Sequence, residues 1–205
     1  MKLHSYICVD DTGFSPNPFW GYCTLANCKP AIRRIASVGD WIVGLSPKKN
    51  GNRIIYAMQV DEVLPYADYY EDSRFAEKIP NFKKGKLVHK LGDNIYKPLP
   101  NRKFQQLRSI HSNKEKARDL SGINVLISQK FHYFGSQALA LPEKLFDLKV
   151  GRSYKNKFSP EVASRFVQFI NEHPHGIIAR PSKWSRNDNS WLLGKSSRFG
   201  QTLAD

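Results

Sequence analysis

The sequence predicts an α+β fold: a small mixed or antiparallel β-barrel or curved sheet flanked by helices. Strand-like and helix-like segments follow one another as strand, helix, hairpin, helix, strand, helix, without the regular alternation of a parallel α/β sheet. Hydrophobic residues make up 40% of the 205, enough for a globular core. We expect one domain over residues 1–173, followed by a basic C-terminal tail over 174–205 that packs on the domain or extends from it.

The first half of the chain supplies a strand, a loop, a helix and a hairpin. The turn residues of DDTGFSPNPFWG (10–21) indicate a loop. Pro30 suits the first position of a short helix, which Gly39 ends. KKNGN (48–52) is predicted to be a hairpin turn, because Asn-Gly favours one. The predicted strands of this half are HSYICV (4–9), DWIVGL (40–45) and RIIYAMQVDEVL (53–64).

The second half contains the strongest helix signal. PYADYYEDSRFAEK (65–78) is acidic at its start and aromatic on one side, which predicts a helix. Residues 81–104 have no clear period and many Lys, Gly and Pro residues, so we expect a long irregular loop. INVLISQKFHYFG (123–135) is predicted to form a strand and an aromatic turn. SPEVASRFVQFINEH (159–173) is predicted to be a helix with Ser159 as its N-cap.

The charge of the chain points to an anionic partner. Lys and Arg number 32 against 18 Asp and Glu, a net charge of +14. Such a field attracts polyanions, so we expect a nucleotide or nucleic acid, DNA or RNA, as partner; a basic surface without a partner is the alternative. Three cysteines, with no secretory leader or membrane span, predict a cytoplasmic protein without a membrane partner. The sequence leaves the oligomeric state open.

The stretch CTLANCKPAIRR (23–34) is the first candidate site. A helix that begins at Pro30 leaves its first N–H groups unpaired, and Lys29 and Arg33 add positive charge, which suits a phosphate or carboxylate. A solvated basic helix end explains the same residues. Cys28 is a candidate nucleophile at this end, although no histidine is near it in sequence and free cysteines are commonly buried. The two cysteines lack a second ligand pair, so we expect no metal.

Other candidates are side chains suited to bases and phosphates. In GDNIY, Asp93, Asn94 and Tyr96 could read a base edge and stack on its ring, although an Asx turn before a buried tyrosine would look the same. Phe131 in FHYFG could also stack, but such runs are more often core. Arg152 in GRSYK could contact a phosphate, with a solvated basic turn as the alternative.

His111, in the sequence SIHS (109–112), is a candidate general base without a fixed partner. Asp93 is a second candidate for acid or base work. The chain has no Walker loop, GxGxxG, HExxH, GxSxG or deaminase signature. The absence of these motifs counts against the common enzyme classes, and the sequence predicts no cofactor.

Several blocks of the chain carry a family resemblance. They are FSPNPFWGYCTLANCKPAIRRIASVGDWIVGL (14–45), IIYAMQVDEVL (54–64), GDNIY (92–96), VLISQKFHYFG (125–135), and GRSYKNKF (151–158) with Phe166. Over most of residues 1–172, the chain resembles the nucleotide modification associated domain 2 family. This resemblance implies a bacterial or phage setting, of modification or defence, in which nucleic acids or nucleotides are modified.

A shorter similarity concerns the fold. The basic helix leading into GDWIVGL and the returning strand IIYAMQVDEVL resemble the PUA-like superfamily, with its EVE and ASCH domains, over about residues 20–64. That similarity implies a small β-barrel with a cleft for a base. The cleft would be lined by Trp20, Asn27, Lys29 and residues near Tyr96.

Two hypotheses about function follow. The first is a module that binds a nucleotide or a modified base, without turnover. The roles expected in it are phosphate binding by Lys29 and Arg33, stacking by Trp20, Tyr96 or Phe131, and base-edge contacts by Asn27, Asp93 and Asn94. The alternative is an enzyme that acts on a nucleotide or nucleobase in the same pocket, with Asp93 as acid or base or Cys28 as nucleophile.

Overall fold

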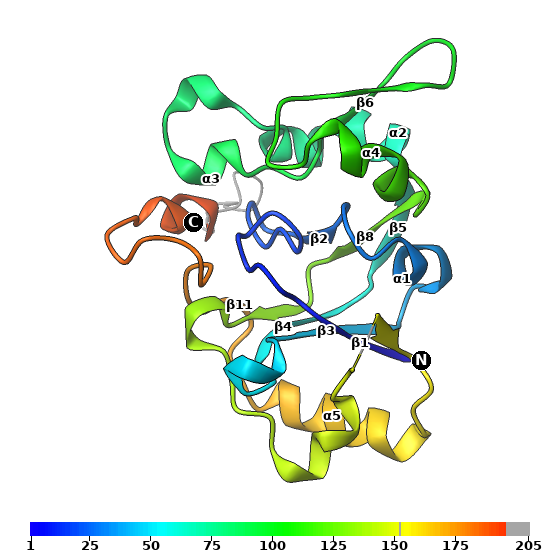
Figure 1. The fold of residues 1–205 in the computed structure, drawn as a ribbon, viewed down its shortest axis with the longest axis vertical. Helices are drawn as coiled ribbons and strands as arrows, with labels where there is room; N and C mark the ends of the chain where they lie inside the picture. Colours follow the sequence, from blue (N-terminus) through cyan, green and yellow to red (C-terminus); the bar gives the residue numbers. More distant parts are fainter. Residues whose placement is uncertain (152, 196–205) are drawn as a thin grey trace, which may run out of the picture.

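The centre of the fold is a six-stranded mixed sheet (Figure 1). The computed structural model describes residues 1–151 and 153–195. The sheet has the order β10-β1-β3-β4-β9-β11, in which β1 runs parallel to β3 and β9 parallel to β11, and the other neighbours are antiparallel. Its strands are β1 (Leu3–Ile7), β3 (Trp41–Leu45), β4 (Ile54–Gln59), β9 (Phe131–Tyr133), β10 (Tyr154–Lys155) and β11 (Gly176–Ile177).

Two smaller sheets complete the β structure. An antiparallel sheet has the order β2-β8-β5, with β2 (Cys23–Leu25), β5 (Glu62–Pro65) and β8 (Asn124–Ser128). A ribbon pairs β6 (Tyr96–Pro98) with β7 (Phe104–Gln106). Strands and helices are mixed without a repeating unit, so the predicted α+β class is confirmed. The closed barrel stays a prediction.

Short helices connect and cover these sheets. The α-helices are α1 (Pro30–Ile35), α2 (Tyr66–Glu71), α3 (Leu87–Lys90), α4 (Asn113–Leu120) and α5 (Pro160–Asn171). The 3-10 helices are η1 (Lys48–Asn50), η2 (Ser73–Lys78), η3 (Phe82–Lys84), η4 (Gly135–Gln137), η5 (Glu143–Leu148) and η6 (Ser190–Lys195). None of the helices in the described ranges is long and apolar enough to cross a membrane.

Helix α5 confirms the strongest helix prediction. The Ser159 hydroxyl accepts the Val162 N–H, which satisfies one of the unpaired donors at the helix start. The apolar face of the helix packs on one side of the large sheet, where Phe166 meets Trp41 edge to face at a ring distance of 5.9 Å. In Figure 1 this helix lies at the end of the molecule opposite α2, α3 and α4.

Three predicted elements differ in detail. The helix from Pro30 ends at Ile35 rather than near Gly39, because Ala36 is extended. The helix predicted over 65–78 divides into α2 and η2, because Asp72 is extended between them and its carboxylate caps the second part. The predicted irregular segment 81–104 contains α3 and strand β6, so it is more ordered than its composition suggests.

The described residues after Pro174 pack against the domain. Strand β11 pairs with β9, and the buried Trp184 donates its Nε1–H to the Thr12 carbonyl at 2.7 Å. The Asp11 carboxylate accepts the Ser182 N–H at 2.7 Å and the Tyr133 hydroxyl. These contacts hold the loop that follows β1, which forms one wall of the cleft described next.

Candidate functional site

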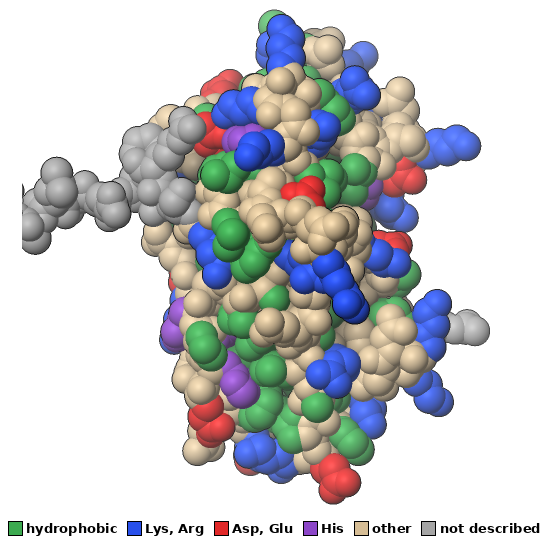
Figure 2. All heavy atoms as spheres, turned by 90° about the vertical axis from the view of Figure 1, so that its left-hand side faces the viewer, with side chains coloured by type: hydrophobic (Ala, Val, Ile, Leu, Met, Phe, Trp, Pro, Cys, Tyr) green, Lys and Arg blue, Asp and Glu red, His purple; other side chains and the backbone are tan. Residues whose placement is uncertain are grey.

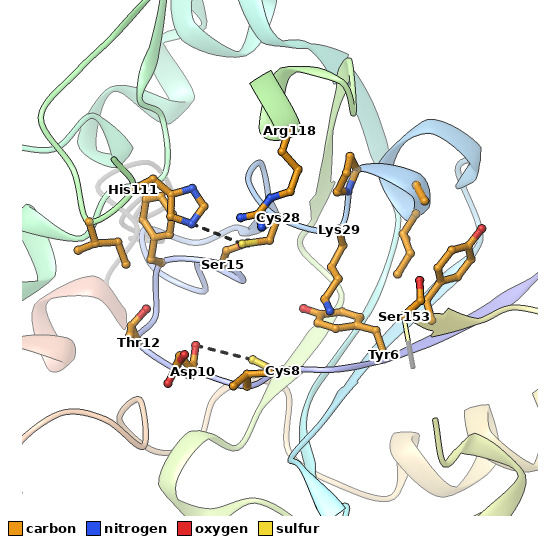
Figure 3. A pocket seen from close by; sticks show the side chains of 17 residues that line it. Tyr6, Cys8, Asp10, Thr12, Ser15, Cys28, Lys29, His111, Arg118 and Ser153 are labelled. Carbon is orange, nitrogen blue, oxygen red and sulfur yellow. Dashed lines mark hydrogen bonds between the residues drawn. The ribbon is translucent and has the colours of Figure 1, made fainter. Parts of the chain in front are cut away.

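A cleft of about 730 Å³ opens between the end of β1 and the start of α1 (Figure 3). The loop that follows β1 and the residues around His111 form further walls, and Ser153 and Tyr154, at the start of β10, also line the cleft. Its volume falls within the range of small-molecule sites. The cleft thus brings segments far apart in the sequence to one place.

Cys28 and Lys29 occupy a strained turn that leads into α1. Their φ angles are 59° and 40°, so both adopt the left-handed conformation that costs a non-glycine residue about 1 kcal/mol. The backbone of Cys28 is held from both sides: its N–H donates to Asp119 Oδ1 at 3.0 Å, and its carbonyl accepts Arg33 Nε–H at 2.8 Å. Cys28 is half-buried and lines the cleft.

Cys28, His111 and Asp119 form a hydrogen-bonded chain. The Cys28 sulfur lies 3.5 Å from His111 Nε2, and His111 Nδ1 lies 2.5 Å from Asp119 Oδ2 (Figure 3 shows the first contact). The Tyr96 hydroxyl donates to the same carboxylate oxygen at 3.0 Å. A nucleophile, a base in contact with it and an acid that orients the base are the three parts of a nucleophilic triad.

Helix α4 places two members of this triad. A capping box starts the helix: Ser112 accepts the Lys114 N–H, and the Glu115 carboxylate accepts the Ser112 N–H at 2.8 Å. His111 immediately precedes the cap, and Phe14 packs on its ring at 4.8 Å. Asp119 lies in the last turn of α4 and is fully buried. The fixed start of the helix therefore sets the positions of the base and the acid together.

The buried Arg33 guanidinium joins the two halves of the site. Besides the Cys28 carbonyl, it donates to the Asp119 carbonyl at 2.5 Å, and to the Tyr66 hydroxyl and the Asn124 carbonyl at 2.7 Å each. Gly122 makes room for it, since a Cβ there would lie 2.3 Å from Arg33 Cζ. The backbones of the nucleophile and the acid are thus fixed to one rigid group.

Hydrogen bonding sets the charge of His111. Burial lowers the pKa of His111, but the hydrogen bonds to Asp119 and Cys28 outweigh it and raise the pKa to about 9. Burial would raise the pKa of Asp119, yet the hydrogen bond and the charge of His111 lower it instead. At neutral pH the pair is therefore an imidazolium and a carboxylate.

The same three residues have the spacing of a metal site, with ligand atoms within 4.8 Å of one another. Their contacts fit the triad better. The Asp119 carboxylate is already occupied by the Cys28 N–H, the Tyr96 hydroxyl and His111. His111 Nδ1 is directed to Asp119 and His111 Nε2 to Cys28. Of the possible ligand atoms of Cys28 and His111, only Cys28 Sγ and His111 Nε2 therefore face each other. The cleft also carries Lys29 and Arg118, which disfavour a cation.

Of the residues predicted for the site, the structure brings Cys28, Lys29 and His111 together in the cleft. Arg33 is buried, and its guanidinium donates to the partners already described. The Tyr96 hydroxyl donates to the Asp119 carboxylate. Arg33 and Tyr96 do not line the cleft, and neither do the other predicted residues Trp20, Asn27, Asp93, Asn94 and Phe131, all of them buried. Their roles toward a ligand stay predictions. Arg152 lies outside the described residues.

These buried residues have structural partners. Trp20 stacks on His89 at 5.2 Å, and Asn27 donates to the Asp93 carbonyl at 2.8 Å. The Asp93 carboxylate accepts the Thr24 and Tyr69 hydroxyls at 2.6 and 2.7 Å, and burial raises its pKa. Asp93, the alternative candidate for the acid or base, thus lies away from the cleft.

Asp119 and Arg118 are functional candidates that the sequence reasoning missed. Both lie in NKEKARDL, a polar segment without an apolar face, which looks like a solvated helix. One signal was available: Ser112 and Glu115 have capping-box spacing, which starts a helix directly after His111. Nothing local shows that Asp119 turns inward, because its burial depends on α1 and β6.

The fold and the cleft define a mixed α+β protein that presents a hydrogen-bonded cysteine, histidine and aspartate in a basic cleft. The family model of nucleotide modification associated domain 2 matches residues 1–188, and the chain belongs to that family. The match confirms the resemblance seen in the sequence and extends beyond it. The family description gives a context of nucleotide modification. Neither a curated protein nor a solved structure matches the chain.

The Arg33 contact predicts a stability difference between two glycines. Gly122→Ala should destabilise the fold by about 1–3 kcal/mol, because the new methyl group meets the guanidinium and forces it off its carbonyl partners. Gly151→Ala is the matched control, since no atom lies within 4 Å of the added Cβ. Urea unfolding of both variants measures the difference, and equal stabilities would contradict it.

The His111–Asp119 pair predicts a dependence of stability on pH. Because the folded-state pKa of His111, about 9, exceeds the unfolded value of 6.5, the stabilisation is complete below pH 6.5 and is lost as pH rises through 9. The loss should reach about 3 kcal/mol. NMR titration of His111 should show the raised pKa, and in Asp119→Asn it should fall toward 6.5. A wild-type value near 6.5 would contradict the pairing.

Proposed function

We propose that the chain is an enzyme that uses Cys28 as a nucleophile on a nucleotide or nucleobase. The observation that carries the proposal is the contact of Cys28 with His111, itself oriented by Asp119. The family description supports a substrate related to nucleotides. A bacterial or phage modification setting, as the resemblance implies, is part of this proposal.

The charges at the site favour attack by sulfur. Arg33, His111 and Asp119 sum to a charge of +1 beside Cys28, which stabilises negative charge that forms on the reacting atoms. His111 Nε2 is the only nitrogen of the ring that faces the sulfur, because Nδ1 is held by Asp119. The imidazole is therefore fixed in the orientation that moves a proton between the sulfur and a substrate.

The chemistry best suited to this arrangement is acyl transfer. In the reactive form, one proton is shared between Cys28 Sγ and His111 Nε2. The sulfur attacks a carbonyl carbon of the substrate, a C–S bond forms, and the bond to the leaving group breaks as that group takes the proton from His111. Water then attacks the thioester and gives a proton to His111; the C–S bond breaks, and the sulfur recovers the proton.

Binding without turnover is the second candidate. The open, basic cleft favours it, and it was the first hypothesis from the sequence. It gives no role to the contact between Cys28 and His111. The arrangement of these residues therefore favours the enzyme, with Cys28 and His111 as the active groups in place of Asp93.

An activated ester tests the nucleophile without knowledge of the substrate. Incubation with p-nitrophenyl acetate should release a burst of nitrophenolate, and peptide mass spectrometry should find the acetyl group on Cys28. Cys28→Ala should abolish the burst, and His111→Gln should slow the acylation by at least about a hundredfold, as expected for loss of the imidazolium that shares its proton with the sulfur and donates it to the leaving group.

Cys8→Ala is the matched control. Cys8 also lines the cleft, but it is buried, burial raises its pKa well above the usual value, and no histidine contacts it among the described residues. Its replacement should leave the burst unchanged. Acylation of Cys8 in place of Cys28, or a rate that His111→Gln does not alter, would overturn the proposal.

A further inference from the structure

Two cations in the cleft have no acidic partner among the residues that the structure describes. Lys29 and Arg118 both line the cleft, and their side chains lie on the same side of it as Cys28 (Figure 3). The one acidic lining residue, Asp10, lies across the cleft and pairs with Lys183 at 3.4 Å. Positive charge therefore gathers around the sulfur.

Lys29 is partly buried, and its charged form loses hydration that a cation–π contact replaces only in part. Its ammonium lies 4.7 Å above the Tyr6 ring, whose hydroxyl is already bonded to Tyr56 at 2.9 Å. Burial lowers the pKa of Lys29; Cys8 and Cys28 act against this effect, and the charge of Arg118 adds to it. An anion between the two cations would remove both costs, because it replaces lost hydration and mutual repulsion with attraction.

The sequence positions of these cations fix them relative to the triad. Lys29 is the neighbour of Cys28 in the strained turn, and Arg118 is the neighbour of Asp119 on α4. Arg33 ties the backbones of Cys28 and Asp119 together. The backbone positions from which both cations reach the cleft are therefore held by the same contacts that hold Cys28 and Asp119.

The surface charge of the molecule agrees with an anionic ligand. Over the face shown in Figure 2, Lys and Arg side chains are spread widely and Asp and Glu are few. The chain as a whole carries a net charge of +14, which draws phosphates toward the molecule. This field attracts many anions, whereas Lys29 and Arg118 select a position beside Cys28.

We propose that Lys29 and Arg118 form a phosphate subsite, so that the substrate of the Cys28 triad is a phosphorylated nucleotide and not a free base or nucleoside. The inference rests on the proposed function for the role of Cys28 and adds the substrate class. Arg118 supplies a planar fork that matches two phosphate oxygens, and Lys29 supplies a point charge. The group recognised at the subsite is a phosphate ester, which belongs either to a free nucleotide or to a nucleic-acid strand.

Binding measurements on the full chain test the subsite. Calorimetry with a nucleoside 5′-monophosphate, the matching nucleoside and a short single-stranded oligonucleotide should show that a phosphate tightens binding by at least about tenfold, as one to two charge-assisted contacts do. Lys29→Met and Arg118→Met should each weaken phosphate-dependent binding by about tenfold. Tighter binding of the monophosphate identifies a free nucleotide as the source, and tighter binding of the oligonucleotide identifies a strand.

Lys114→Met is the control for net charge, because Lys114 lies exposed on the same helix and does not line the cleft. It should leave the affinity within about twofold. Equal binding of nucleoside and monophosphate, or an equal loss in Lys114→Met, would overturn the subsite.

The same titration with Cys28→Ser separates this inference from the proposed function. Phosphate-dependent binding retained in Cys28→Ser, together with a wild-type protein that fails the ester test, leaves the subsite standing and refutes the nucleophile. Acylation of Cys28 without any preference for phosphate refutes the subsite alone.

Discussion

The buried guanidinium of Arg33 is the interaction on which the site depends. A buried cation is costly unless its donors are engaged, and Arg33 donates four hydrogen bonds, to the carbonyls of Cys28, Asp119 and Asn124 and to the Tyr66 hydroxyl. These partners come from the turn before α1, the end of α4, the first residue of β8 and α2. One side chain thus fixes the relative position of four elements, and Gly122 leaves the space for it.

This arrangement explains why a strained turn persists at Cys28. Two consecutive residues in the left-handed conformation are unfavourable, and they are retained because Asp119 and Arg33 hold both polar groups of the Cys28 backbone. The same carboxylate orients His111, so the acid of the triad also positions the nucleophile. The strained turn, the charged residues and the hydrogen-bonded triad all lie at the cleft, as is common at active sites. The family context of nucleotide modification is compatible with this chemistry.

The sequence predicted those features that local signals determine. Ser159 and the apolar spacing after it predicted α5. Pro30 predicted the start of α1 and so the position of Cys28 and Lys29 directly before that helix. The family resemblance was also readable from contiguous blocks. Tertiary contacts determined the rest. Arg33 has the appearance of a phosphate ligand in sequence, yet its donors are directed to carbonyls from distant segments. Asp119 lies in a polar helix, and only the approach of α1 and β6 buries it.

The most direct test of the account is the rate at which iodoacetamide alkylates Cys28 at neutral pH. We predict that Cys28 reacts at least about tenfold faster than a free small-molecule thiol, and that Arg33→Lys removes this advantage while the protein stays folded, because lysine cannot reproduce the fork. Arg34→Lys, at the exposed neighbouring position that contacts the Ser121 carbonyl, should react like the wild type. A Cys28 that reacts no faster than a free thiol, or equally in both variants, would contradict the account.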